Sequence, residues 1–220
     1  MRRALAVLAT LLAVAFLPSV PAQAATVHQP VLFVHGYNSS GATWNDMVAR
    51  FKAVGYTDAE LFAISYNTNQ SNVITAQQLQ TKVDEIRQQT GWAKVDIVTH
   101  SMGSLSSRYY LRNLGGQAFV DAWVSLAGAN HGTSTAKFCP GVSCKEMRPR
   151  SSFLSQLNSG DETPGAVRYR TWWSPCDTTI NPDSSVSLIG ATNTKTACLG
   201  HSALLSDATV FGQVDTFIDP

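Results

Sequence analysis

The sequence alternates short apolar runs with longer segments that have the periodicity of amphipathic helices. Val31–Val34 is apolar throughout, which is typical of a strand buried on both faces of a sheet. In the 71–89 segment, Val73, Leu79 and Val83 belong to one apolar stripe at helical spacing, and Ser71 is placed to cap the helix. Strands that alternate with helices of about ten residues or more predict βαβ units and a mostly parallel sheet.

The same reasoning assigns elements along the rest of the chain. We expect strands at 31–34, 60–66, 95–98, 122–126, 167–173 and 186–189, and helices at 43–54, 71–89, 104–114 and 208–218. The 127–149 stretch has no such pattern, and irregular loops of that length are often functional. Since the chain shows neither an internal repeat nor an interdomain linker, we expect one α/β domain.

Composition excludes several classes of protein. Hydrophobic residues make up 44% of the 220-residue chain, which is enough apolar material to argue against disorder. Charged residues make up only 14%, and the net charge is +1, so there is no basic excess to bind nucleic acid. A polytopic membrane protein is excluded because only one long apolar run is present.

That apolar run lies at the N-terminus and predicts a cleaved secretory signal peptide over residues 1–24. Arg2 and Arg3 precede an uncharged stretch at 4–17, and Ala22 to Ala24 supplies the small-x-small pattern of a cleavage site. The stretch is shorter than the roughly 20 residues of a transmembrane helix. We therefore expect a secreted protein, cleaved near Ala24, with no stable membrane anchor and a single domain over residues 25–220.

The cysteines agree with export. All four lie after the leader, and their number is even, which favours disulfides in an oxidising compartment. Three pairings are possible, and proximity suggests Cys139 with Cys144 and Cys176 with Cys198. A zinc site is the weaker alternative, because the chain has no Cys-x-x-Cys pair and no paired histidine spacing.

The third expected strand leads directly into Thr99-His100-Ser101-Met102-Gly103, and a helix follows. A sharp strand-to-helix turn of this kind exposes a serine hydroxyl at the edge of the sheet, beside the free N–H groups of the helix N-terminus. Gly103 lets the strand and the helix approach closely. We therefore predict that Ser101 is a nucleophile rather than an incidental helix-capping serine.

Together with His35-Gly36-Tyr37 after the first strand, this motif resembles the α/β-hydrolase superfamily. The closer resemblance is to the small secreted bacterial lipases and esterases, including the compact lidless lipases of Bacillus, and it extends to Gly200-His201. It implies a minimal, lidless α/β-hydrolase fold with a mostly parallel central sheet flanked by helices. Thr99 departs from the family pattern, which has Gly or Ala at that position.

The resemblance also implies an oxyanion hole. One donor is the backbone N–H of Met102, directly after the nucleophile, and we assign the second to the N–H of Tyr37. Such preorganised donors contribute a few kcal/mol each to transition-state stabilisation. Gly36 permits the backbone turn that this loop needs. His35 is expected to hold the loop rather than act as the base.

A serine nucleophile needs a base, because a hydroxyl reacts poorly at neutral pH. The order of the superfamily is serine, then acid, then histidine, and only His131 and His201 follow Ser101. His201 follows the last strand, where the resemblance places the base. His131 lies in a loop after the fourth strand, and we expect it to have a structural role.

The acid is expected in the loop after the strand that ends near residue 173. Asp177 is the first choice, because it adjoins Cys176, whose expected partner Cys198 lies three residues before the base. Asp183 is the alternative. Glu162 precedes the strand and has the pattern of a solvent-exposed residue.

The predicted reaction is hydrolysis of acyl esters or triacylglycerols through an acyl-enzyme, with no metal and no cofactor. Tyr37, Trp172 and Trp173 are expected to line the acyl cleft. The predicted partner is therefore an ester substrate or a lipid met at a lipid–water interface, and we expect a monomer. A polyester or cutin hydrolase, a phospholipase and an acyltransferase would use the same residues. A noncatalytic binding protein on this scaffold is the remaining alternative.

Overall fold

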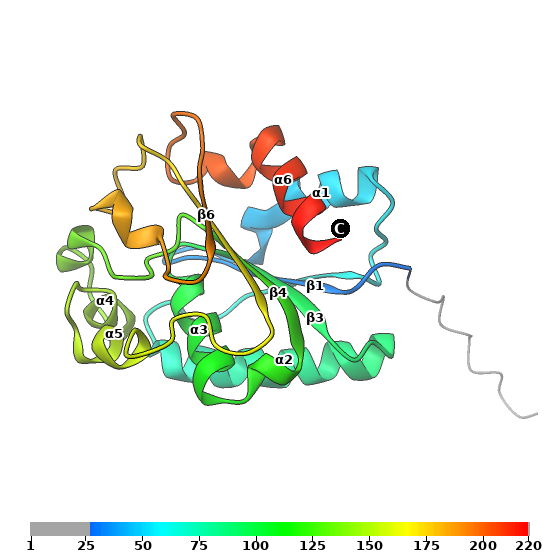
Figure 1. The fold of residues 1–220 in the computed structure, drawn as a ribbon, viewed down its shortest axis with the longest axis horizontal. Coiled ribbons are helices and arrows are strands. Elements are labelled where there is room, and N and C mark those ends of the chain that lie inside the picture. Colours follow the sequence, from blue (N-terminus) through cyan, green and yellow to red (C-terminus); the bar gives the residue numbers. More distant parts are fainter. Residues whose placement is uncertain (1–26, 220) are drawn as a thin grey trace, which may run out of the picture.

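The computed structural model describes residues 27–219, and its centre is a six-stranded sheet (Figure 1). All neighbouring strands are parallel, and their order is β2-β1-β3-β4-β5-β6. The strands are β1 Val31–Val34, β2 Leu61–Ile64, β3 Val95–His100, β4 Val120–Leu126, β5 Arg168–Trp173 and β6 Thr192–Lys195. Because the strands are parallel, the loops that follow them meet at one edge of the sheet.

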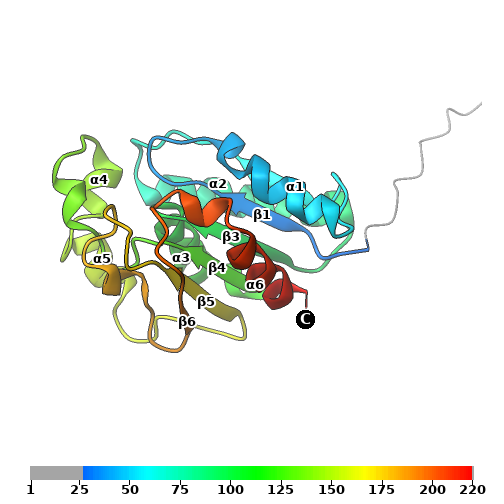
Figure 2. The ribbon, with the colours of Figure 1, turned by 90° about the horizontal axis from the view of Figure 1, so that it is seen from above.

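Helices cover both faces of the sheet, with α1 and α6 on one face and α2 and α3 on the other (Figures 1 and 2). Two short helices, α4 and α5, lie at the end where the strands terminate. The helices are α1 Asn45–Ala53, α2 Asn72–Thr90, α3 Gly103–Asn113, α4 Val142–Glu146, α5 Ser152–Leu157 and α6 Ala208–Ile218. Short 3₁₀ segments lie at Gly41–Trp44, Gly116–Ala118, Ser134–Lys137, Asp183–Val186 and Ala203–Leu205.

The buried side chains form two apolar layers, one on each face of the sheet. Met47 and Phe51 of α1 pack with Phe211 of α6 in one layer. Leu79 and Val83 of α2 belong to the other layer. Burying a side chain of this size contributes roughly 1.5–3 kcal/mol, so the apolar helix faces hold the sheet between them. The predicted α/β-hydrolase architecture is thus confirmed.

The expected strand at 186–189 is wrong. Asp183–Val186 is a 3₁₀ turn, and the last strand is β6, a few residues further on. Val186 and Leu188 are buried individually against the rest of the fold rather than within a strand. β6 is an edge strand, and its side chains are largely exposed. It therefore needs no large apolar residue, and it contains none. Hydrophobic patterning therefore could not locate it.

Both disulfides expected from proximity are present, Cys139–Cys144 and Cys176–Cys198. The first closes a short loop within the irregular stretch, where the structure places a 3₁₀ turn and α4. The predicted signal peptide lies outside the described residues. Within residues 27–219, the helices are too short or too polar to cross a bilayer.

Candidate active site

Ser101 lies in a tight turn between β3 and α3. Its φ is +54°, in the left-handed region that residues other than glycine rarely adopt. The turn is fixed by hydrogen bonds from the Ser101 N–H to the Leu126 carbonyl and from the Ala129 N–H to the Ser101 carbonyl, at 3.0 and 3.2 Å. Strained backbone of this kind costs roughly 1–3 kcal/mol and is characteristic of functional sites. A sharp turn between a strand and a helix is the local structure that a nucleophile elbow requires.

Gly103 allows α3 to lie directly against β1. A Cβ at this position would lie 2.6 Å from the carbonyl oxygens of both Val34 and His35. These are backbone atoms, so the strand itself would have to move.

We expect Gly103→Ala to destabilise the fold by about 1–3 kcal/mol and to reduce activity, because it pushes the nucleophile turn away from β1. Thermal unfolding and ester hydrolysis measure the two effects. Gly212→Ala in α6 is the matched control, since an added Cβ there meets no atom within 4 Å. Equal stability of the two variants would contradict this account of the turn.

Thr99, which departs from the family pattern, is fully buried. Its Oγ1 donates a hydrogen bond of 2.8 Å to the carbonyl of Val124 on β4. The hydroxyl is therefore satisfied within the sheet, and the turn forms despite the β-branched residue.

The imidazole of His201 contacts the buried carboxylate of Asp177 at the same edge of the sheet. His201 Nδ1 lies 2.7 Å from Asp177 Oδ2, and the carboxylate is 2% exposed. The other oxygen, Oδ1, accepts the backbone N–H groups of Thr179 and Ile180 at 2.7 and 3.1 Å. Burial raises the pKa of Asp177, but the hydrogen bond and charge of His201 and these two amides outweigh it and lower the pKa overall. The carboxylate is thus held ionised beside the imidazole.

The ring nitrogens distinguish His201 from His131 and His35. In the described part of the chain, His201 Nε2 has no hydrogen-bond partner, so it is free to exchange a proton. His131 has both nitrogens engaged, with Glu162 and with the Ser185 carbonyl. His35 is also engaged at both, with the Gly36 carbonyl and the Tyr66 N–H. Neither of these rings presents a free nitrogen for general-base catalysis.

The Ser101 hydroxyl itself makes no hydrogen bond among residues 27–219. Hydrogen bonds between catalytic side chains often form only when substrate is bound, which agrees with a Ser101 hydroxyl that has no partner here.

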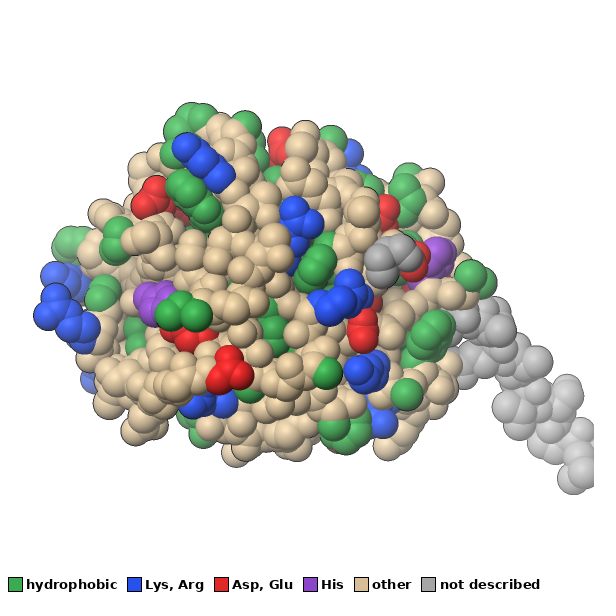
Figure 3. All heavy atoms as spheres, viewed as in Figure 1, with side chains coloured by type: hydrophobic (Ala, Val, Ile, Leu, Met, Phe, Trp, Pro, Cys, Tyr) green, Lys and Arg blue, Asp and Glu red, His purple; other side chains and the backbone are tan. Residues whose placement is uncertain are grey.

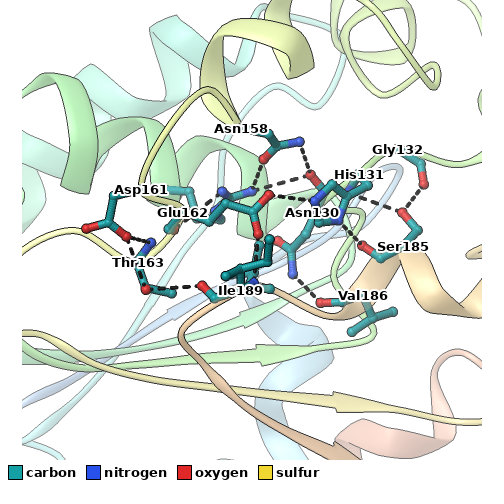
Figure 4. Close-up of polar contacts among 12 residues, drawn as sticks. Asn130, His131, Gly132, Asn158, Asp161, Glu162, Thr163, Ser185, Val186 and Ile189 are labelled. Carbon is teal, nitrogen blue, oxygen red and sulfur yellow. Dashed lines mark hydrogen bonds and ion pairs between the residues drawn. The ribbon is translucent and has the colours of Figure 1, made fainter.

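Glu162, expected to be exposed, is instead buried; its side chain is 6% exposed. Its Oε1 lies 2.7 Å from His131 Nε2, and its Oε2 accepts the Ile189 N–H at 2.8 Å. Figure 4 shows how these contacts join the loop after β4 to the segments before and after β5. No periodic pattern of apolar residues around Glu162 reveals this burial.

Arg108 of α3 completes the same network. It donates to the Asn158 side chain and to the Asn130 carbonyl. Burial lowers the pKa of Arg108 to about 10, which still leaves it a cation at neutral pH. The network therefore holds the loops around the site in place.

His100, directly before the nucleophile, was not assigned a role by the sequence. Its Nε2 lies 3.1 Å from the His201 carbonyl, and the two rings lie 4.5 Å apart. Burial, followed by the charge of His201, lowers the pKa of His100 to about 3. A neutral His100 donates to that carbonyl and so helps to position the loop that carries His201.

The loops that carry Asp177 and His201 are joined to each other. The Cys176–Cys198 disulfide links them covalently. Ser174 adds a second link, because its hydroxyl donates to the Leu199 carbonyl and accepts the Leu199 N–H, at 2.6 and 2.9 Å. These links limit the relative motion of Asp177 and His201.

The backbone N–H groups of Tyr37 and Met102 form no hydrogen bond within the described residues. Met102 precedes the first turn of α3, where backbone N–H groups lack helical partners. The loop carrying Tyr37 passes close to the nucleophile, since a Cβ on Gly36 would lie 2.8 Å from the Ser101 Cβ. Two unpaired donors therefore belong to the segments that adjoin the serine.

A pocket of about 180 Å³ opens beside Ser101. Its lining is mostly apolar or weakly polar: Tyr37, Thr133, Thr135, Ala136, Cys139, Met147, Thr179 and Ile180. Thr133 and Thr135 both donate to the Thr179 carbonyl, which fixes the pocket wall against the loop of Asp177.

The two tryptophans expected in the cleft lie elsewhere. Trp172 is fully buried and donates to Gln213 of α6 at 2.8 Å, so it is a core residue. Trp173 is partly buried and packs under Lys195 of β6. Neither is part of the pocket lining. Asp183 is exposed at the start of a 3₁₀ turn, whereas Asp177 contacts the imidazole.

Metal ligands do not gather at the site or elsewhere in residues 27–219: no three His, Cys, Asp or Glu side chains are grouped to hold an ion.

The fold and the arrangement of the site define an α/β-hydrolase. Residues 28–210 match the model of the class 2 lipase family, and the chain belongs to this family of lipases and esterases.

Solved structures show the same fold at low sequence identity. The mature lipase BlEst2 of Bacillus licheniformis has a TM-score of 0.73 at 19% identity, with 90% of this chain and 94% of that chain covered. Lipase B of Aspergillus fumigatus has a TM-score of 0.74 at 17% identity, covering 84% of this chain and 50% of that one. For the metagenomic carboxyl esterase MGS0156 the TM-score is 0.66 at 17% identity, with 84% and 68% covered.

Proposed function

We propose that this protein is a serine ester hydrolase in which Ser101, His201 and Asp177 form the catalytic triad. The observation that carries the proposal is the 2.7 Å contact between His201 Nδ1 and the buried Asp177 carboxylate, near a serine held at φ +54°. A carboxylate on Nδ1 leaves Nε2 as the basic nitrogen and stabilises the imidazolium that forms.

In the proposed reaction, His201 Nε2 takes the Ser101 proton while Oγ attacks the ester carbonyl. The N–H groups of Tyr37 and Met102 donate to the resulting oxyanion. His201 then gives the proton to the departing alcohol, which leaves Ser101 acylated. Water loses a proton to the same nitrogen and attacks the acyl group, and Ser101 regains its proton as the carboxylic acid leaves.

The substrates we propose are acyl esters, including triacylglycerols. Support comes from the class 2 lipase family and from the mostly apolar pocket beside Ser101. Polyester hydrolysis, phospholipid hydrolysis and acyl transfer use the same catalytic groups. A series of p-nitrophenyl esters of increasing chain length, emulsified triglyceride and a polyester film separate these activities.

Two reagents test the proposal on the purified mature protein. We expect it to hydrolyse p-nitrophenyl butyrate, and we expect a fluorophosphonate to inactivate it by forming one adduct at Ser101. Mass spectrometry of the digested protein locates the adduct, and Ser101→Ala is the blank. Absence of hydrolysis, or labelling of Ser101→Ala at wild-type stoichiometry, would overturn the assignment and favour a binding protein.

We further propose that the chain is exported by its N-terminal leader and acts as a monomer outside the cell. Two disulfides among the described residues are consistent with an oxidising compartment. N-terminal sequencing of the protein recovered from culture medium tests cleavage near Ala24.

A further inference from the structure

The stretch from Lys137 to Arg150, here called the basic segment, has a charge unlike that of the rest of the chain. It contains four cations, Lys137, Lys145, Arg148 and Arg150, and one carboxylate, Glu146. The whole chain has a net charge of only +1, so positive charge is concentrated in this segment.

These cations are not neutralised locally. Among the described residues, no ion pair involves any of the four. Glu146 is turned to other partners: its oxygens accept hydrogen bonds from the Ser71 hydroxyl and from the backbone and side chain of Asn72. Figure 3 shows Lys and Arg side chains at the end of the molecule where α4 and α5 lie.

The same segment exposes two large apolar side chains. Phe138 is 89% exposed and Val142 is 50% exposed. The Cys139–Cys144 disulfide closes a loop that contains Val142 and begins next to Phe138, and the Val142 N–H donates to the Asn69 carbonyl at 3.2 Å. The apolar residues are therefore presented on a constrained loop, which limits the conformational entropy lost when they bind.

This loop borders the pocket beside Ser101. Cys139, next to Phe138, lines the pocket, and so do Ala136 and Met147. A surface that took up Phe138 would therefore lie close to the pocket beside the nucleophile.

We propose that the basic segment docks the protein on an anionic lipid surface. Phe138 and Val142 enter the boundary between headgroups and acyl chains, while the three exposed cations, Lys137, Lys145 and Arg150, contact the anionic headgroups. Arg148 is half-buried, and its Nε donates to the Ala136 carbonyl at 3.2 Å. A segment that combines exposed apolar side chains with cations that form no ion pair fits this one occupant by charge complementarity. Docking does not depend on the triad, so it is tested separately from the proposed function.

Co-sedimentation of the mature protein with vesicles tests the proposal. We expect binding to vesicles of phosphatidylcholine mixed with phosphatidylglycerol, weaker binding to phosphatidylcholine alone, and loss of binding at high ionic strength. Lys137→Gln combined with Lys145→Gln is expected to weaken binding by about tenfold or more. Phe138→Ser is expected to weaken it by about tenfold.

Matched controls lie outside the segment. Lys52→Gln with Lys82→Gln removes the same charge from α1 and α2, and Ile189→Ser removes an apolar side chain that is 81% exposed. We expect wild-type binding from both controls, and from Ser101→Ala. All segment variants are expected to hydrolyse a soluble ester as the wild type does.

Several results would overturn the proposal. Equal binding to the two vesicle types is one, and absence of binding to either is another. Equal losses in the segment variants and their controls would also overturn it. Because Ser101→Ala is included, a failure of docking is distinguishable from a failure of the hydrolase assignment.

Discussion

Replacing His201 by alanine is expected to lower kcat for a soluble ester by about a million-fold, the size of loss that removing the base causes in a serine protease triad. His201 is the proposed base: its Nδ1 contacts the Asp177 carboxylate, and its Nε2 has no partner among the described residues. Without it, nothing at the site removes the proton from Ser101. Steady-state rates with p-nitrophenyl butyrate measure the loss.

His131→Ala is the matched control, because His131 also follows the nucleophile and also contacts a buried carboxylate. We expect its kcat to stay within a few-fold of the wild type. Its stability should fall by about 1–3 kcal/mol, since Glu162 loses a hydrogen-bond partner in a buried position. If His131→Ala lost activity as completely as His201→Ala while remaining folded, the base would be misassigned.

Asp177→Asn is expected to lower kcat by about ten-thousand-fold. The Asp177 side chain faces two backbone N–H groups through Oδ1 and the imidazole through Oδ2. An asparagine satisfies the two N–H groups with its carbonyl oxygen, which turns its NH₂ toward His201 Nδ1. Nδ1 must then accept, so the proton moves to Nε2, and the ring can no longer take one from Ser101.

Asp183→Asn is the corresponding control at the exposed alternative position, and we expect it to hydrolyse esters at the wild-type rate. Thermal unfolding of both variants shows that the comparison is between folded proteins. Wild-type activity in Asp177→Asn, or a large loss in Asp183→Asn, would move the acid to the second residue.

The sequence predicted those elements of the fold that the local spacing of apolar residues marks. The expected strands at 31–34, 95–98 and 167–173 lie in β1, β3 and β5, and the stripe of Leu79 and Val83 lies in α2. β6 was missed because an edge strand needs no apolar face. The apolar residues of 186–189 misled the assignment, because isolated buried residues in a loop have the same composition as a short strand.

The site divides in a similar way. Ser101 and Gly103 were identifiable because the turn, its strand and its helix are contiguous in the chain. The burial of Glu162 depends on segments far apart in sequence, and no local pattern marks it. Trp172 was expected in the cleft because tryptophan is a common cleft-lining residue. The register of β5 and the packing of α6 place it in the core instead.

By itself, the sequence indicated most of the strands and helices and the tight turn around Ser101, because each depends on residues close together in the chain. It left three cysteine pairings open, and proximity favoured the two that form. Only the tertiary structure decided which carboxylate meets His201 and which histidines have both ring nitrogens engaged. The parallel sheet gathers the loops after its strands at one edge, so contacts between those loops arise from topology rather than from neighbouring residues.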